Sequence, residues 1–261
     1  MNYNLCIVQF DRSNRKPDIN AQKMIQILKE VKEADFILLP EDWLGPLVVD
    51  EDYHMSVIGL MQNSLPSENI LLISGAQYVR QSEVIISTGA FVTKKRIAFY
   101  DKIFPSHAIG ERHFVTPGTR QPVFEYRGIK VSAVVCVDLF YPEIVRKLAL
   151  KGAQIIFNPA NIPAGRMDLW QHIGITRAAE NTVFLAMANN TRTSYPDGRE
   201  VTGRSFVAGP DGLFFNDTDT EPGILRATLD ISLIDQVRSR WKYLDDVSKK
   251  CPQLMKGDSD N

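Results

Sequence analysis

The feature of this sequence that most constrains its fold is the alternation of short apolar runs with longer amphipathic stretches. Tyr3 to Phe10 and Ala34 to Leu39 are apolar and β-prone, whereas Ile19 to Lys32 between them repeats its apolar residues at helical spacing. The alternation returns later, where helical stretches at Glu143 to Lys151 and Met167 to Asn181 precede further strands. Strands separated by helices in this way place the helices on the faces of a sheet.

Elsewhere the strands follow one another too closely for a helix to intervene. Lys94-Lys95 and Arg127-Gly128 each separate two apolar β-prone runs, and both pairs of runs are typical of hairpins. Hairpins make antiparallel neighbours, so the sheets must be mixed. We therefore predict an α/β fold in which two mixed β-sheets face each other with helices outside.

Length and composition are those of one large domain. The chain has 261 residues, of which 44% are hydrophobic and 23% charged, which is enough to build a sizeable core. No composition shift or flexible linker divides it, so we expect one domain over residues 1–245 and a polar C-terminal tail over 246–261. No apolar run approaches the roughly 18 residues of a membrane span, and the first residues lack a secretory signal.

Charge and cysteine content argue against several classes of partner. The 30 basic and 31 acidic residues nearly cancel, which disfavours a general nucleic-acid or membrane-surface binder. Cys6, Cys136 and Cys251 are far apart and form no CxxC pair, a pattern that suits a reducing cytoplasm and predicts no zinc ribbon. His107 and His113 have no evident third ligand, so we predict no metal site.

Cys136 is the candidate nucleophile with the strongest local argument. It lies in VVCVDLFYPE, where an apolar strand (Ile129 to Val135) stops and a helix is expected from Pro142. A cysteine at such a corner is held rigidly with its sulfur able to face a pocket, and the N–H groups that follow it could stabilise an oxyanion. The alternative interpretation is a small buried hydrophobe.

Two further segments carry side chains that complement a nucleophilic sulfur. In FILLPEDW (36–43), an apolar strand runs into Pro40-Glu41 and delivers a carboxylate to the strand end, where α/β sheets build their sites. Apolar neighbours would raise the pKa of this carboxylate, so that it could act as general base and acid. In FYDKIF (99–104), Lys102 follows a hairpin strand and could supply positive charge to an oxyanion. The alternatives are a surface acid and a solvated lysine.

Together, a carboxylate, a lysine and a cysteine at strand ends predict nucleophilic catalysis. A serine nucleophile is disfavoured because GRSFVAG (203–209) lacks the GxSxG pattern. The sequence also contains no GxGxxG after its first strand and no P-loop motif, so a nucleotide cofactor is unsupported.

In these motifs and their order, the sequence resembles the nitrilase superfamily, the carbon–nitrogen hydrolases, over nearly the whole chain to about Trp241. LPE (39–41) resembles the family's glutamate motif, YDK (100–102) its lysine motif and CVDLFYPE (136–143) its cysteine motif. Gly110-Glu111 matches an additional family glutamate, held to position substrate or assist proton transfer. FNPA (157–160), RAAEN (177–181) and GRSFVAGPDG (203–212) add to the likeness.

The resemblance implies a four-layer αββα sandwich that pairs through helices into a homodimer or a higher dimer-based oligomer. It also implies a catalytic triad of Glu41, Lys102 and Cys136. In that scheme Glu41 takes the thiol proton, Cys136 attacks an amide or nitrile carbon, and Lys102 and the backbone N–H of Val137 stabilise the tetrahedral intermediate. The scheme requires no cofactor and no metal.

Three positions depart from the family patterns. True nitrilases commonly carry tryptophan and then glutamate after the cysteine, where this chain has Val137-Asp138, and family amidases often carry arginine where it has Phe140. These differences favour an amide over a nitrile as substrate. The neighbours of the motifs are the candidate substrate contacts, namely Trp43, Val137, Phe140, Tyr141 and Asn158.

We therefore predict a cytoplasmic, cysteine-dependent amidase that cleaves a non-peptide C–N bond in a small linear amide through a thioester and releases ammonia or an amine. An N-carbamoyl amidohydrolase or a nitrilase is the alternative within enzymes. A catalytically silent homologue that acts in binding or assembly is the alternative of another class, and the complete set of Glu41, Lys102 and Cys136 argues against it.

Overall fold

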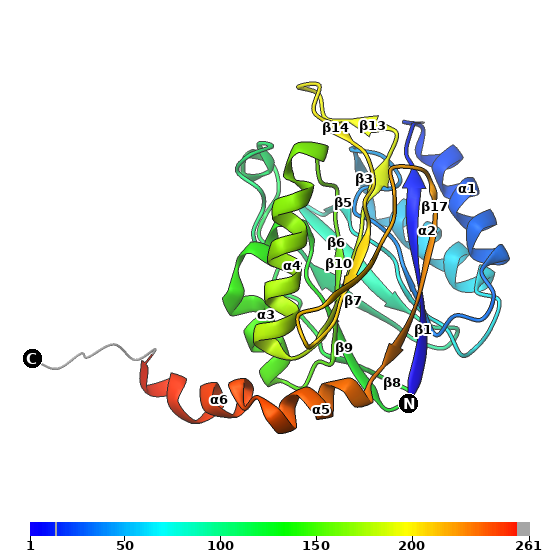
Figure 1. The fold of residues 1–261 in the computed structure, drawn as a ribbon. Coiled ribbons are helices and arrows are strands. Elements are labelled where there is room, and N and C mark those ends of the chain that lie inside the picture. Colours follow the sequence, from blue (N-terminus) through cyan, green and yellow to red (C-terminus); the bar gives the residue numbers. More distant parts are fainter. Residues whose placement is uncertain (14, 255–261) are drawn as a thin grey trace, which may run out of the picture.

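The computed structural model describes residues 1–13 and 15–254, and within them two β-sheets stand face to face with helices on both outer sides (Figure 1). Helices α1 (Pro17–Glu30) and α2 (Glu51–Ser64) cover one sheet, and α3 (Pro142–Leu150) and α4 (Met167–Asn181) cover the other. This arrangement confirms the predicted α/β fold, a four-layer αββα sandwich of two mixed sheets.

The first sheet has nine strands within the described residues, and its main path runs β12-β1-β2-β4-β6-β5-β3. Off this path, β17 pairs antiparallel with β1, and β7 pairs antiparallel with β6 in the predicted hairpin. The strands are β1 (Asn2–Asp11), β2 (Phe36–Leu38), β3 (Val48–Asp50), β4 (Leu71–Ile73), β5 (Gln77–Gln81), β6 (Val84–Val92), β7 (Ile97–Asp101), β12 (Asn190–Thr191) and β17 (Gly223–Asp230).

The second sheet has six strands in the described part of the chain, in the order β16-β15-β11-β10-β9-β8. Its centre is parallel, because β10 pairs with β9 on one side and with β11 on the other. The strands are β8 (Phe124–Tyr126), β9 (Ile129–Ala133), β10 (Ile155–Pro159), β11 (Phe184–Ala188), β15 (Phe206–Ala208) and β16 (Phe214–Asp217). A separate hairpin of β13 (Thr193–Ser194) and β14 (Glu200–Val201) extends from one end of the sandwich (Figure 1).

Strand β1 shows how one apolar run builds two cores. Leu5 and Ile7 belong to the cluster that includes β9, β10 and β11, whereas Cys6 and Val8 belong to the cluster shared with α1 and α2. Successive side chains of a strand point to opposite faces, so both faces of β1 are buried. The sheet is therefore covered on the inside by its partner sheet and on the outside by helices.

The apolar, β-prone run from Ile70 to Val79 is interrupted. Residues 70–79 form β4 and β5, with Gly75 between them at a φ of +76°. A Cβ at Gly75 would lie 2.1 Å from the carbonyl oxygen of Pro40, so the position accepts only glycine. This close approach packs the end of β4 against the segment that leads into Glu41.

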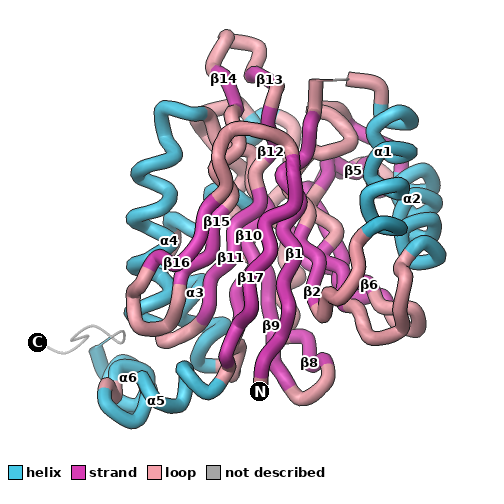
Figure 2. The backbone as a smooth tube through the Cα atoms, turned by 45° about the vertical axis from the view of Figure 1, so that its right-hand side comes forward, coloured by secondary structure: helices cyan, strands magenta, loops and turns pink. Residues whose placement is uncertain are grey.

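The C-terminal helices α5 (Ser232–Arg240) and α6 (Tyr243–Leu254) run along one end of the sandwich (Figure 2). The segment expected to be a polar tail is therefore helical as far as Leu254, and the domain boundary at residue 245 stays a prediction. The side chain of Cys251 and residues 255–261 lie outside the described part of the chain.

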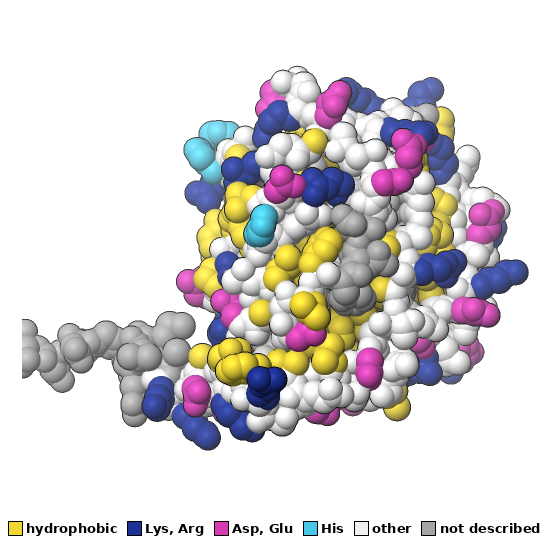
Figure 3. Space-filling model, viewed as in Figure 1, with side chains coloured by type: hydrophobic (Ala, Val, Ile, Leu, Met, Phe, Trp, Pro, Cys, Tyr) yellow, Lys and Arg dark blue, Asp and Glu magenta, His cyan; other side chains and the backbone are white. Residues whose placement is uncertain are grey.

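Two surface properties bear on partners. None of the described helices is long and apolar enough to cross a membrane. On the face shown in Figure 3, acidic and basic side chains are interspersed, in keeping with a net charge of -1.

Candidate active site

Glu41 is held in place by its backbone. Its N–H donates to the carbonyl of Ala160 at 3.2 Å, and the side chain of Asn190 donates to the Glu41 carbonyl at 2.7 Å. Ala160 follows β10 and Asn190 lies on β12, so segments of both sheets fix the turn after β2. The Glu41 side chain is 2% exposed, which excludes the alternative of a surface acid.

Lys102 follows β7 directly and is completely buried between two carboxylates. Its Nζ donates to Glu41 Oε1 at 2.9 Å and to Glu111 Oε1 at 2.7 Å. A buried ammonium group is tolerated only when opposite charges and hydrogen bonds compensate it, as they do here. The alternative of a solvated lysine is therefore wrong.

Glu111 belongs to the short 3-10 helix η1 (Glu111–His113) and is itself tied down on both oxygens. The hydroxyl of Tyr78 on β5 donates to Oε1, and the backbone N–H of Ser106 donates to Oε2, each at 2.5 Å. Glu111 is thus a fixed carboxylate that holds the Lys102 ammonium group.

Cys136 lies at the corner between β9 and α3, as predicted, and it begins the 3-10 helix η2 (Cys136–Phe140). Its φ of +48° is in the left-handed region, which costs a residue with a side chain about 1 kcal/mol or more and marks many functional turns. The side chain of Asn158 holds this turn by donating to the carbonyls of Val134 at 2.8 Å and Cys136 at 3.2 Å. Trp170 in turn donates to Asn158 at 3.3 Å.

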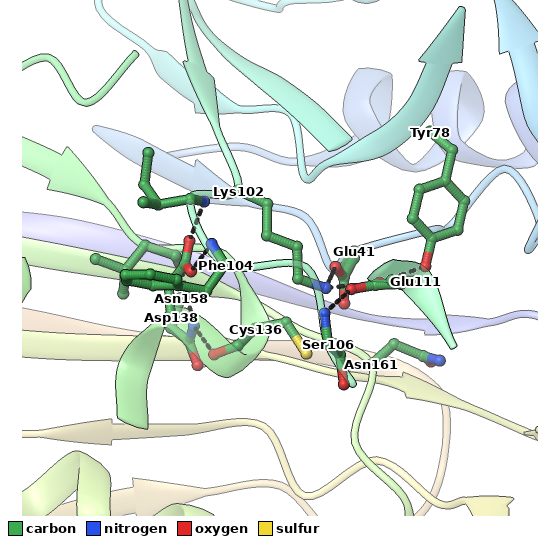
Figure 4. Close-up of polar contacts among 12 residues, drawn as sticks. Glu41, Tyr78, Lys102, Phe104, Ser106, Glu111, Cys136, Asp138, Asn158 and Asn161 are labelled. Atoms are coloured by element: carbon green, nitrogen blue, oxygen red, sulfur yellow. Dashed lines mark hydrogen bonds and ion pairs between the residues drawn. The ribbon is translucent and has the colours of Figure 1, made fainter. Parts of the chain in front are cut away.

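The sulfur, the ammonium group and the carboxylates meet in one place (Figure 4). Cys136 acts electrostatically on both Glu41 and Lys102, and a hydrogen bond between Cys136 and Glu41 lowers the pKa of that carboxyl. The backbone N–H of Asn161 also faces the sulfur and lowers the pKa of the thiol. The structure therefore assembles the predicted cluster from segments that lie 34 to 95 residues apart in the sequence.

Burial sets the resting protonation of this cluster. Burial first, and then the charge of Glu41, raise the pKa of the Cys136 thiol well above its usual range. Burial also raises the pKa of Glu41, against the opposing effect of Lys102. For Lys102, burial acts to lower the pKa, but Glu41, Cys136 and Glu111 together raise it well above its usual range. The resting site thus favours a neutral thiol beside a charged lysine.

Asp138, two residues after the cysteine, clamps the cysteine turn to the lysine segment. Its two carboxylate oxygens accept the backbone N–H groups of Ile103 at 2.9 Å and Phe104 at 2.8 Å, directly after Lys102. Burial raises the pKa of Asp138 to about 7, although both hydrogen bonds act to lower it. The sequence motif contained this residue, but its spacing alone did not indicate a partner 34 residues away.

Helix α4 supports the same turn from the other side. Arg177 donates to the carbonyls of Leu139 at 3.0 Å and Phe140 at 3.3 Å and forms an ion pair with Glu180 at 3.0 Å. Asn181 donates to the Arg177 carbonyl at 2.9 Å. These contacts are structural, of the kind that charged and amide side chains make at the end of a helix.

Cys136 opens into a cavity of about 600 Å³ with a mainly apolar wall. Val137, Phe140 and Tyr141 line it, as predicted for substrate contacts. Phe140 packs on Trp170 with ring centres 4.5 Å apart, and Tyr141 stacks on Phe104 at 4.0 Å. The other lining residues are Ser106, Ala108, Ile109, Asn161, Ile162, Pro163, Arg166, Trp170, Tyr195 and Arg199.

Two predicted substrate contacts lie elsewhere. Trp43 packs edge-on against Phe10 in the core cluster of α1 and α2 and donates to the carbonyl of Ser74 at 2.8 Å, so its ring faces away from the cavity wall. Asn158 is fully buried beneath the Cys136 turn and lies outside the cavity lining. The side-chain amide of Asn158 hydrogen-bonds the carbonyls of that turn, so Asn158 is a positioning residue.

Among the described residues, no group of three or more His, Cys, Asp or Glu side chains could hold a metal ion.

The sequence did not indicate Tyr78 and Tyr195, which lie on other strands and loops. The signal for Tyr78 was its place on a buried β-prone run, but that signal is shared by many core tyrosines.

Comparison with known proteins agrees with this geometry. A family model described as carbon–nitrogen hydrolase matches residues 5–239. A 2-oxoglutaramate amidase from Bacillus subtilis (strain 168) is 32% identical over 259 residues, which cover 95% of this chain and 99% of that protein.

Solved structures share the fold. A CN-hydrolase superfamily protein from Xanthomonas campestris, with an arsenic adduct in its active site, superposes with a TM-score of 0.84 at 18% identity, covering 94% of this chain and 97% of that chain. A mutant amidase from Nesterenkonia sp. AN1, with the acetamide moiety of fluoroacetamide added covalently at the active-site cysteine, gives 0.81 at 22% identity, covering 97% and 96%. With the family model matched over most of its length, this chain belongs to the carbon–nitrogen hydrolases, in the amidase-like branch of the nitrilase superfamily.

Proposed function

We propose that the protein hydrolyses a small linear amide through a thioester on Cys136 and releases ammonia or an amine. The observation that carries this proposal is the burial of Lys102 between Glu41 and Glu111, next to a cysteine at the floor of a mainly apolar cavity. Such an arrangement combines a nucleophile, a proton acceptor and a fixed positive charge.

The first half-reaction uses Glu41 as general base. Burial raises the pKa of the Glu41 carboxyl, which makes it a better base for the neutral Cys136 thiol. As the proton moves to Glu41, the sulfur attacks the amide carbon and the carbonyl oxygen becomes an oxyanion. Lys102 and the backbone N–H of Val137, in the first turn of η2, stabilise this negative charge.

The intermediate then loses its nitrogen. The C–N bond breaks, Glu41 gives its proton to the leaving amine, and the acyl group stays on Cys136 as a thioester. In the second half-reaction a water molecule gives a proton to Glu41 and attacks the thioester carbon. The C–S bond breaks, the sulfur recovers the proton, and a carboxylic acid leaves.

Glu111 acts through Lys102 in this scheme. Because Tyr78 and Ser106 donate to both of its oxygens, its carboxylate cannot turn away from the lysine. It keeps the ammonium group charged and aimed while the charge on Glu41 changes during the reaction.

The relatives favour amide hydrolysis over its alternatives. Two of them are named 2-oxoglutaramate amidase and one is named (R)-stereoselective amidase, although a nitrilase and an N-carbamoylputrescine amidase also occur among the more distant ones. The Val137-Asp138 pair after the cysteine supports the amide choice. A silent binding protein is disfavoured because the buried charges of Lys102 and Glu41 would bring a folding cost without a benefit.

A cytoplasmic location and a homodimer remain proposals. The odd, dispersed cysteines support the first, since Cys6 and Cys136 are both buried thiols. The second is supported by Trp241 and Tyr243 between α5 and α6, which stack on each other and are 47% and 44% exposed.

Ammonia release from a panel of small amides, N-carbamoyl amines and nitriles tests the proposed function. We expect turnover of amides, and we expect Cys136→Ala to reduce it by about 10⁴-fold or more because the nucleophile is lost. Cys6→Ala is the matched control, since Cys6 is an equally buried cysteine in the other core cluster. Amide turnover that survives Cys136→Ala would reject Cys136 as nucleophile.

A further inference from the structure

A second cavity adjoins the catalytic one. It measures about 390 Å³ and shares Ala108, Ile109, Asn161, Tyr195 and Arg199 with the catalytic cavity. Its other lining residues are Arg12, Asp42, Pro46, Tyr78, Phe114, Ser194, Pro196 and Asp197. These five shared residues place the two cavities side by side.

The wall of the second cavity contains a buried arginine. Arg12 follows β1 and is 2% exposed. Within the described residues its guanidinium group makes one hydrogen bond, from Nη1 to the backbone carbonyl of Asp42 at 3.0 Å, and its Nε has no partner. A buried guanidinium carries five N–H donors and a full charge, so this side chain has most of its binding capacity unused.

Asp42 does not neutralise this arginine through an ion pair. No carboxylate oxygen in the described chain lies within 4.0 Å of the Arg12 guanidinium, and Asp42 Oδ1 is buried without a partner. Burial and then the charge of Glu41 raise the pKa of Asp42 well above its usual range, which favours its neutral form. The charge of Asp42 acts on Arg12 through space, but within the described residues the guanidinium group forms no ion pair.

The rest of the lining adds positive charge. Arg166 and Arg199 line the catalytic cavity, whose described lining contains no Asp or Glu. In the second cavity the acids are Asp42 and Asp197, and Asp197 is already paired with Arg199 at 2.7 Å. The two adjacent cavities thus offer a mainly apolar wall beside the sulfur and cations elsewhere in their lining.

We propose that the second cavity binds the carboxylate of an amide that is also an acid, with Arg12 as the specificity residue. This inference rests on the proposed function, because the amide end of the same molecule would lie at Cys136. Tyr195 lines both cavities. The substrate would be a short chain with an amide at one end and a carboxylate at the other.

Three amides of similar length and different charge test this inference, namely 5-amino-5-oxopentanoate, pentanamide and 5-aminopentanamide. We expect kcat/KM to fall in that order, with the acid ahead of the neutral amide by about 10- to 100-fold, as a charge-assisted carboxylate contact allows. In Arg12→Gln the ratio of acid to neutral amide should fall towards one, mainly through KM. Arg12→Lys should keep part of the preference for the acid. Arg80→Gln, at an exposed position of β5, is the matched control and should keep the wild-type preference.

The outcomes separate this inference from the proposed function. If Cys136-dependent hydrolysis occurs with no preference for the acid, or if Arg12→Gln keeps the preference, the second cavity is not a carboxylate site although the protein is an amidase. Calorimetric titration of the Cys136→Ala protein with glutarate needs no turnover. Binding that is lost in the Cys136→Ala, Arg12→Gln double variant would support the carboxylate site even if no amide were hydrolysed, and absence of glutarate binding would overturn it.

Discussion

At the residue scale, the site depends on charges that are buried but compensated. Lys102 is fully buried, and its two hydrogen bonds to Glu41 and Glu111 replace the water it has lost. The carboxylate of Asp138 is also buried, but its hydrogen bonds come from two backbone N–H groups and not from a cation. This difference makes Asp138 sensitive to pH.

Asp138→Asn should flatten the pH dependence of stability. Burial raises the pKa of Asp138 to about 7, whereas an aspartate in an unfolded chain titrates near about 3.9. Between these values the native chain holds a proton that the unfolded chain lacks, so the free energy of unfolding falls as the pH rises from about 4 to about 7. From pH 5 to pH 8 the wild type should lose about 2 kcal/mol more than the variant.

Urea unfolding at a series of pH values measures this difference. All other titrating groups are common to the two proteins, so their contributions cancel in the comparison. Parallel stability curves for the two proteins would show that Asp138 keeps an ordinary pKa and that burial does not control it.

The sequence indicated some of these residues and not others, for a physical reason. Glu41, Lys102 and Cys136 follow apolar strands directly, and that position is visible in the chain. The roles of Tyr78, Asp138 and Arg12 depend on hydrogen bonds to segments 30 to 35 residues away, which no local pattern reports. Trp43 was misplaced because it neighbours Glu41 in sequence but points into the opposite core.

At the element scale, helix α4 and the 3-10 helix η2 act as a unit. Arg177 on α4 bonds the carbonyls of Leu139 and Phe140 at the end of η2, and Trp170 on the same helix bonds Asn158 beneath its start. Helix α4 therefore holds the cysteine turn at both ends. The left-handed conformation of Cys136 persists because its surroundings fix it in this way.

Arg177→Met should lower both stability and turnover. It leaves the two carbonyls without their partner, which should cost about 2 kcal/mol of unfolding free energy, and it loosens the turn that carries the sulfur. Arg204→Met is the matched control, because Arg204 also bonds α4, through Asp168 and Gln171, but on the solvent side. Thermal unfolding and amide kinetics of both variants measure the effects. Equal losses in the two variants would contradict a special role of Arg177.

Elements with a strong apolar period were predictable, and short polar ones were not. The helix expected at Met167 to Asn181 has the bounds that the sequence suggested. Strands β3, β13 and β14 have two or three residues each, too few to show a period. Residues 70–79 showed a continuous β pattern, and the interruption at Gly75 arises from contact with Pro40, which is a tertiary effect.

At the scale of the whole molecule, the site exists only because the two sheets stack. Glu41 and Lys102 follow β2 and β7 of the nine-stranded sheet in the described chain, whereas Cys136 follows β9 of the six-stranded one. The sequence predicted a sandwich of two sheets, but it could not predict which loops of one sheet would meet which loops of the other. The second cavity at Arg12 is a consequence of the same stacking.

We expect groups from both sheets to cooperate in forming a thioester on Cys136. Intact-protein and peptide mass spectrometry after rapid acid quench with a small amide measures this species directly. We predict a mass increase equal to the amide minus ammonia, located on the peptide that contains Cys136 and absent from Cys136→Ala. Ammonia release in the first turnover without any acyl mass on Cys136 would contradict it.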